Sequence, residues 1–182
     1  FTFFQIGAKN VLIANPRDIP GFVAEMGTHQ FSVLSGVNTL FNALLNNEAF
    51  CALDFSTLKV TLGGGMAVQK AVADKWMQVT GKPLVEAYGL TETSPAATIN
   101  PLNIKAYNGS IGLPISSTEV EIRDDNGQAV AHGQPGELCV RGPQVMKGYY
   151  NRPDETANVM MADGFLRTGD VAVMDDNGFF RI

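Results

Sequence analysis

Three short stretches of the chain combine residue types that could bind a ligand. The first, Tyr88–Pro95, reads Tyr-Gly-Leu-Thr-Glu-Thr-Ser-Pro and follows a short apolar run that we interpret as the end of a buried strand. Open α/β sheets bind ligands at the carboxyl ends of their strands. There the ring of Tyr88 could stack on a base, the hydroxyls could bond phosphate, and the Glu92 carboxylate could hold Mg²⁺ through oxygen. A polar loop capped by its own Thr and Ser side chains explains the stretch equally well.

The other two stretches are weaker on their own. Gly63–Gly65 follow an apolar run and precede a helix pattern, where bare backbone could closely approach a flat ligand or an anion. They lack the Lys-Ser/Thr of a phosphate-binding loop, so a tight strand-to-helix turn is the simpler explanation. Arg167–Asp170 reads Arg-Thr-Gly-Asp between two β-like runs, and an aspartate on a rigid turn could bind both hydroxyls of a ribose. An Asp-stabilised turn without any ligand would have the same sequence.

Alternating strand and helix patterns in the first half must position Gly63–Gly65 and Tyr88–Pro95. Apolar residues at helical spacing predict three helices, near residues 19–26, 40–45 and 68–79. Short apolar runs predict four strands, near residues 10–14, 31–34, 58–62 and 83–87. Gly81 stands where a helix-ending glycine belongs. This alternation predicts an α/β fold, a mainly parallel sheet with covering helices.

The sequence changes character after about residue 108. Short alternating runs predict antiparallel strands near residues 118–124, 136–141, 165–168, 171–175 and 178–182. Asp-Asp-Asn-Gly occurs twice, at 124–127 and 175–178, and Asn-Gly favours tight hairpins because both residues tolerate a positive φ. One short helix is expected from Pro153 to Met160. We therefore predict an α/β subdomain over residues 1–109, followed by a smaller, barrel-like antiparallel β subdomain over residues 110–182.

Composition and charge argue against several classes of protein. The net charge of −5 on 182 residues, without a Lys/Arg cluster, argues against nucleic acid as a partner. No apolar run approaches the ~18 residues of a membrane-spanning helix. Cys51 and Cys139 lie far apart with no His or Cys at ligand spacing, so we expect reduced thiols rather than a zinc site. We expect a cytoplasmic protein, and peripheral contact with the inner membrane face stays open.

Together and in this order, the stretches resemble the adenylate-forming superfamily of acyl-CoA synthetases, adenylation domains and luciferases. Gly63–Ala67 resembles its glycine-rich adenine-side segment, Tyr88–Glu92 its Tyr-Gly-x-Thr-Glu motif, and Arg167–Asp170 its Thr-Gly-Asp motif. The run from Gly136 to Tyr150 resembles its Gly-Glu-Leu…Gly-Tyr segment. Within the superfamily, three further runs look most like bacterial long-chain fatty-acid–CoA ligases, at residues 15–20, 36–44 and 142–146. The resemblance covers essentially the whole chain.

The resemblance implies a role for each stretch. Thr91 and Glu92 are the expected catalytic residues, since Thr91 would hydrogen-bond the α-phosphate and Glu92 would coordinate Mg²⁺. Tyr88 would stack on adenine and Asp170 would hold both ribose hydroxyls. The expected nucleotide-binding set is Gly63, Gly64, Gly65, Tyr88, Gly89, Thr91 and Asp170. A fatty-acid tunnel would run between the sheet and the helix that carries Leu40, Phe41 and Leu44.

The implied activity is that of an AMP-forming long-chain fatty-acid–CoA ligase. A fatty-acid carboxylate attacks the α-phosphate of ATP and displaces pyrophosphate, and the thiol of coenzyme A then attacks the acyl-adenylate and releases AMP. Catalysis of the first step would be mostly positioning and charge compensation. The alternatives are another adenylate-forming enzyme, such as a short-chain or aryl-acid ligase or a peptide-synthetase adenylation domain, and a non-catalytic AMP-binding module.

Two parts that the superfamily requires have no match in the chain, namely the phosphate-binding loop and the C-terminal lysine. The chain also begins with Phe1 rather than methionine. We therefore expect a piece of a longer protein that is inactive alone and self-associates through apolar surface left uncovered.

Overall fold

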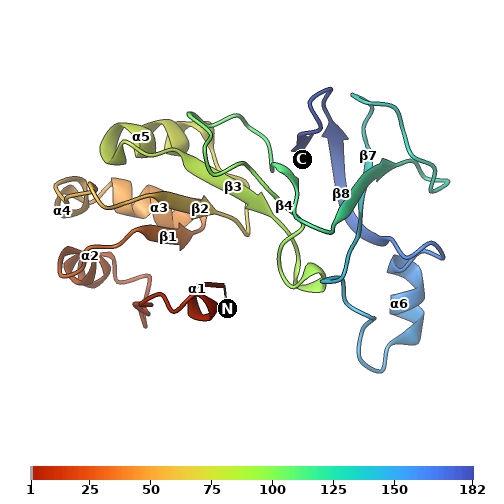
Figure 1. The fold of residues 1–182 in the computed structure, drawn as a ribbon, viewed down its shortest axis with the longest axis horizontal. Helices are drawn as coiled ribbons and strands as arrows, with labels where there is room; N and C mark the ends of the chain where they lie inside the picture. The colour runs from red at the N-terminus through yellow and green to blue at the C-terminus, as the bar shows by residue number, and fades with distance from the viewer. Residues whose placement is uncertain (1) are drawn as a thin grey trace.

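Two sheets follow one another along the long axis of the molecule (Figure 1). The structure is a computed structural model and describes residues 2–182. Strands β1, β2 and β3 of the first sheet run parallel, whereas β3, β4 and β5 pair antiparallel. In sheet order these are β1 (Val33–Gly36), β2 (Val60–Gly63), β3 (Leu84–Tyr88), β4 (Thr98–Ile99) and β5 (Leu113–Pro114).

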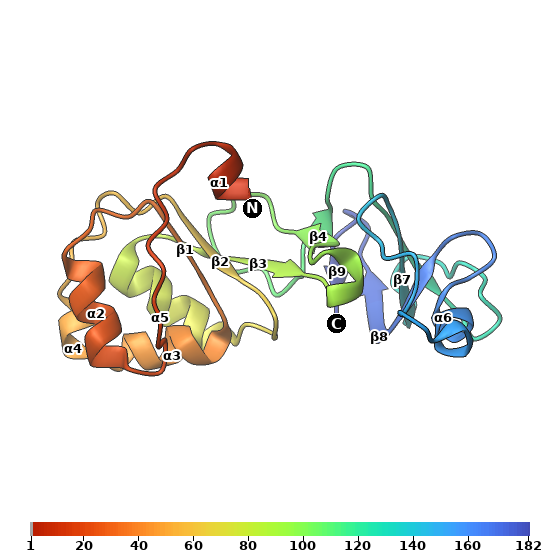
Figure 2. The ribbon, with the colours of Figure 1, turned by 90° about the horizontal axis from the view of Figure 1, so that it is seen from below.

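Helices α2 to α5 of the first half pack together over one face of this sheet, and α1 lies apart from them (Figure 2). Right-handed crossovers between neighbouring parallel strands place successive helices on the same side. The helices are α1 (Thr2–Gln5), α2 (Ile19–Gly27), α3 (Asn38–Leu45), α4 (Glu48–Cys51) and α5 (Lys70–Thr80). The Asp18 side chain caps α2 by accepting a hydrogen bond from the Gly21 amide, and Gly81 ends α5 at φ +69°. The three helices predicted from apolar spacing are confirmed.

One predicted strand is wrong. Residues 10–14 are irregular, and the Leu12 side chain is 82% exposed. A strand needs a neighbour with which to form a ladder of hydrogen bonds, and β1 pairs only with β2 among the described residues. A short apolar run therefore did not suffice to make a strand here.

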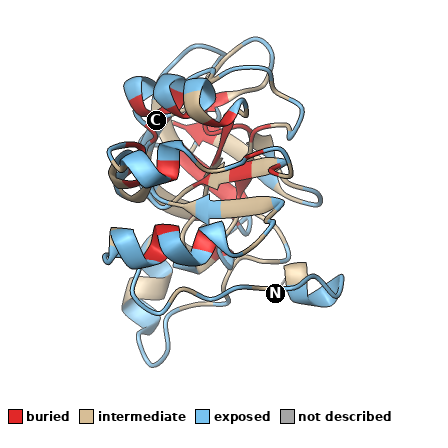
Figure 3. Cartoon of the chain, turned by 90° about the vertical axis from the view of Figure 1, so that its left-hand side faces the viewer, coloured by how far each residue is buried: buried red, intermediate tan, exposed pale blue. Residues whose placement is uncertain are grey.

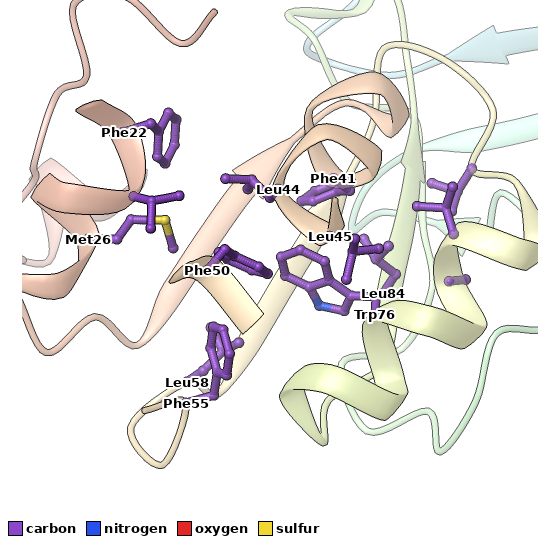
Figure 4. Packing of buried hydrophobic residues seen from close by; sticks show 14 residues of the cluster. Phe22, Met26, Phe41, Leu44, Leu45, Phe50, Phe55, Leu58, Trp76 and Leu84 are labelled. Carbon is purple, nitrogen blue, oxygen red and sulfur yellow. The ribbon is translucent and has the colours of Figure 1, made fainter. Parts of the chain in front are cut away.

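Figure 3 shows the buried residues of the helices and strands in red. Trp76 of α5 is the centre of the larger core (Figure 4). Its ring lies 4.9 Å from the ring of Phe41 and 5.4 Å from that of Phe50, measured between centroids. Its indole N–H donates to the Thr61 hydroxyl at 3.2 Å. Phe41 and Leu44 are fully buried in this core, so packing explains this part of the apolar face of α3, and the fatty-acid tunnel stays a prediction.

Truncating Leu44 should test how far the first half depends on this core. Leu44→Ala removes a fully buried side chain and leaves a cavity, which we expect to lower the free energy of unfolding by about 2–5 kcal/mol. Trp76, the single tryptophan, reports unfolding in urea by fluorescence. Leu102→Ala is the control, since Leu102 is 59% exposed. Equal losses in the two variants would contradict a core role for Leu44.

The second sheet is antiparallel throughout and curls into a half-barrel. Its strands in order are β6 (Glu119–Arg123), β7 (Gly136–Arg141), β8 (Leu166–Met174) and β9 (Phe180–Arg181), with α6 (Pro153–Val159) between β7 and β8. Phe180 joins the two sheets, because its carbonyl accepts from the Ile111 amide and its amide donates to the Gly112 carbonyl. The predicted fold class is confirmed. The division at residue 109 stays a prediction, and β5 beyond it pairs within the first sheet.

The two Asp-Asp-Asn-Gly segments form turns of the same kind. Gly127 and Gly178 have positive φ, but neither asparagine does. In each turn the first aspartate is the organising residue; the Asp175 carboxylate accepts hydrogen bonds from the amides of Asn177 and Phe179. Only the glycine therefore uses the left-handed region, as in hairpins that end a type I turn with a glycine.

Candidate functional site

The first two predicted stretches leave the sheet at the same edge. β2 and β3 are parallel neighbours with Gly63 opposite Glu86, so Gly63–Gly65 and the residues after Tyr88 emerge side by side. Packing and backbone conformation within the chain explain two of these glycines. A Cβ on Gly63 would lie 2.8 Å from a Val68 methyl, and Gly65 has a positive φ of +76°, which favours glycine. Their contact with a base stays a prediction.

Tyr88 and Asp170, 82 positions apart, are in direct contact. The Tyr88 hydroxyl donates to Asp170 Oδ2 at 2.6 Å. Burial, and secondly the hydrogen bond to Asp170, raise the pKa of Tyr88 well above its ordinary value. The phenol is therefore the donor and Asp170 the acceptor. This bond joins the carboxyl end of β3 in the first sheet to β8 in the second.

Asp170 does not lie on a turn between two strands, as the sequence suggested, but inside the single strand β8. Glu137 pairs with Val171 and Cys139 with Arg167, so three residues, Thr168–Asp170, face Leu138 alone. This bulge contains Gly169 at φ +77°. The Thr168 hydroxyl donates to the Leu138 carbonyl at 2.7 Å, which replaces a missing ladder bond. Bulges re-aim side chains beside functional sites, and this one directs Asp170 to Tyr88.

Glu137 holds the bulge from the neighbouring strand. Its Oε1 accepts from the Gly169 amide at 3.0 Å, and its Oε2 accepts from the Arg167 guanidinium at 3.2 Å. Glu137 is therefore a positioning residue for the bulge that carries Asp170. Sequence reasoning assigned it no role, although it lies in the Gly-Glu-Leu segment, because its partners are 30 and 32 positions away.

The Thr-Glu stretch forms a short 3₁₀ turn, Thr91–Thr93. Thr91 is exposed and Glu92 is half-buried, and the Glu92 Oε1 accepts a hydrogen bond from the Tyr149 hydroxyl at 2.8 Å. Thr93 is fully buried, and its hydroxyl oxygen accepts from the Leu90 amide. Gly89 is required by packing, since a Cβ there would lie 1.6 Å from the Pro95 carbonyl oxygen.

A half-open cavity of about 290 Å³ lies between this turn and the bulge. Its lining includes Glu92 and Tyr149 on one side and Glu137, Arg167 and Gly169 on the other. Tyr88 and Asp170 are outside that lining, so the cavity adjoins the expected nucleotide position rather than marking it.

The acidic residues fit a cation that arrives with a phosphate ligand better than a resident metal centre. Among residues 2–182, no three His, Cys, Asp or Glu side chains cluster closely enough to hold a metal ion. Mg²⁺ at phosphate sites is held by one or two carboxylates, with water and substrate phosphates completing its shell. Glu92, a single half-buried carboxylate on an open turn, fits that arrangement.

Glu86, at the same strand end, is buried and makes a pH prediction possible. Its carboxylate accepts from the Val68 amide at 2.8 Å, but burial dominates and raises its pKa above the ordinary 4.5. The folded chain thus binds this proton more tightly than the unfolded chain. The resulting stability is complete below pH 4.5 and is lost as pH rises through the raised value.

Glu86→Gln should remove this part of the pH dependence. Urea unfolding at several pH values above 4.5 should show the free energy of unfolding falling less steeply with pH in Glu86→Gln than in the parent chain. Glu48→Gln, at an exposed position, should keep the parent slope. An unchanged slope in Glu86→Gln would contradict the assignment.

A partly parallel sheet followed by an antiparallel half-barrel is the architecture of CoA ligases that form acyl-adenylates. An anthranilate CoA ligase, AuaEII, solved with anthranoyl-AMP, has the same fold, with a TM-score of 0.88 over 98% of this chain and 34% of that chain at 23% identity. MatB from Rhodopseudomonas palustris, solved with ATP bound, aligns at a TM-score of 0.78 and 28% identity over 92% of this chain and 32% of that one.

Residues 1–150 match the family described as AMP-binding enzyme, and the chain belongs to that family. A long-chain-fatty-acid–CoA ligase of Yersinia pestis is 61% identical over 180 residues, which are 99% of this chain and 32% of that protein. The chain therefore spans about a third of the length of the curated relatives it matches.

Proposed function

We propose that the protein containing this chain is an AMP-forming long-chain fatty-acid–CoA ligase that uses ATP, Mg²⁺ and coenzyme A. The observation that carries the proposal is the 2.6 Å bond between Tyr88 and Asp170, because it brings two separate motifs of the resemblance to one sheet edge. The long-chain acyl substrate is supported by the 61% identity to the ligase of Yersinia pestis.

Each side chain has a defined task in this proposal. The ring of Tyr88 stacks on adenine while its hydroxyl holds Asp170. A carboxylate has about four lone-pair sites, so Asp170 can bind Tyr88 and still accept both ribose hydroxyls. The exposed Thr91 hydroxyl donates to the α-phosphate. Mg²⁺, held by Glu92, supplies compensation for the negative charge that builds on the phosphoryl oxygens.

Product analysis of the full-length protein tests the proposal. With ATP, Mg²⁺, coenzyme A and palmitate, we expect AMP and the acyl-CoA thioester in equal amounts. Benzoate in place of palmitate tests for an aryl-acid ligase, which is one form of the first alternative. AMP binding without any AMP formation from ATP and either acid would favour the second alternative, a non-catalytic module, and would contradict the proposal.

Cytoplasmic location, peripheral membrane contact and self-association stay predictions. Across residues 2–182 no helix is long and apolar enough to cross a membrane. Phe4, Ile6 and Leu12 expose more than half of their surface, which supports self-association near the amino-terminal end.

A further inference from the structure

The last part of the segment from Gly136 to Tyr150 forms two hydrogen bonds with Glu92. The Met146 amide donates to the Glu92 backbone carbonyl at 2.8 Å, and the Tyr149 hydroxyl donates to Glu92 Oε1 at 2.8 Å. One bond fixes the backbone of the glutamate and the other fixes its carboxylate. The proposed reaction gives this segment no task, so these contacts need a separate explanation.

Tyr149 is itself held in place by α6. Its amide donates to the Thr156 hydroxyl oxygen at 2.9 Å, and that hydroxyl donates to the Arg152 carbonyl. Gly148 lies against the same threonine, since a Cβ on Gly148 would be 2.7 Å from the Thr156 methyl. The hydroxyl of Tyr149 therefore reaches Glu92 from a fixed backbone position.

The same segment is also anchored on the chain that follows Glu92. The Gln144 amide group donates to the Ala96 carbonyl at 3.1 Å and to the Thr118 hydroxyl at 2.8 Å. Gln144, Met146 and Tyr149 thus contact residues 92–96 from one side. These contacts fix the position of residues 144–149 relative to the 3₁₀ turn.

Chemically, a phenol suits a carboxylate that must bind a cation. A glutamate on an open turn has several rotamers. A hydrogen bond to one carboxylate oxygen restricts these rotamers before the cation binds, so cation binding itself costs less side-chain entropy. The neutral phenol leaves the negative charge in place and leaves Oε2 free as a ligand. Carboxylates that bind metal ions are commonly held by such hydrogen bonds, and loss of the partner weakens metal binding or activity about 10–100-fold.

We propose that Tyr149 is a positioning residue that holds the Glu92 carboxylate ready for the divalent cation that accompanies the nucleotide. The inference rests on the proposed function, which makes Glu92 the cation ligand. Tyr150, the next residue, provides a matched control because it is also a tyrosine but is 91% exposed.

Cation affinity tests the role directly. Mn²⁺ is titrated into the full-length protein with an ATP analogue that carries a methylene between the α- and β-phosphorus, and free Mn²⁺ is measured by electron paramagnetic resonance. Tyr149→Phe should raise the apparent Kd for Mn²⁺ about tenfold. Tyr150→Phe should leave it unchanged. Mn²⁺ affinity in Tyr149→Phe equal to or tighter than that of the parent protein would overturn the inference.

Kinetics provides the second readout. In Tyr149→Phe the Mg²⁺ concentration for half-maximal AMP formation should rise by the same factor, while kcat at saturating Mg²⁺ stays near the parent value. If Tyr149→Phe does not fold, Thr156→Val, which removes the anchor of Tyr149 but keeps its hydroxyl, should raise the Kd by a smaller factor, and an unchanged Kd there would overturn the inference. A parent protein that binds Mn²⁺ and the analogue but forms no AMP contradicts the proposed function alone.

Discussion

Asp170→Asn should weaken the binding of AMP to the full-length protein about 100-fold. Asparagine keeps one acceptor oxygen and can still accept from Tyr88, so the bond between the sheets can persist. The asparagine lacks the negative charge and the second acceptor oxygen of the aspartate. In our proposal the charged carboxylate accepts hydrogen bonds from both ribose hydroxyls. Hydrogen bonds to charged groups contribute about 1.5–3 kcal/mol each, and a loss of about 3 kcal/mol corresponds to about 100-fold in Kd. Calorimetric titration with AMP measures the effect.

Asp176→Asn is the matched control, since Asp176 is an exposed carboxylate on the hairpin that follows the same strand. Its AMP affinity should equal that of the parent protein. The AMP affinity of Tyr88→Phe should lie between those of Asp170→Asn and Asp176→Asn. The ring remains for stacking, but Asp170 loses the hydroxyl that donates to it at 2.6 Å. AMP affinity in Asp170→Asn within twofold of the parent would contradict the proposal that Asp170 binds the ribose.

The strand ends that carry the candidate site could be predicted because their signals are local. An apolar run followed by glycine, or by polar residues, indicates the end of a buried strand. The structure accordingly ends β2 at Gly63 and β3 at Tyr88. The helices were predictable for the same reason, since the apolar spacing lies within the sequence of each helix and Gly81 directly follows α5.

What could not be predicted depends on partners that are distant in sequence. The bulge at Thr168–Asp170 exists only because β7 and β8 pair with a shift of register around Leu138, whereas the sequence of β8 alone predicts two short strands joined by a turn. Glu137 and Tyr149 act through residues 32 and 57 positions away. Residues 10–14 show the converse error, because an apolar run predicts a strand without revealing whether a neighbouring strand exists to pair with it.

Glu92→Gln should slow formation of the acyl-adenylate in the full-length protein by about 100- to 1,000-fold, the effect expected when a group that stabilises transition-state charge is lost. Glutamine has nearly the same shape, and its Oε1 can still accept from Tyr149, so the turn should keep its geometry. The loss would therefore come from the missing charge and the weaker binding of Mg²⁺. Single-turnover measurement of acyl-adenylate formation isolates this step from product release.

Glu92→Gln and Asp170→Asn should fail in different ways, which separates the two halves of the site. Calorimetry without a divalent cation should show that AMP binds Glu92→Gln as it binds the parent protein, because Glu92 contacts the nucleotide through Mg²⁺ alone in this proposal. Asp170→Asn should lose AMP binding under the same conditions. Glu48→Gln, which removes an exposed carboxylate from the first turn of α4, should change neither quantity. An adenylation rate in Glu92→Gln within about threefold of the parent rate, at saturating Mg²⁺ and ATP, would show that the carboxylate next to Tyr149 has no catalytic charge to contribute.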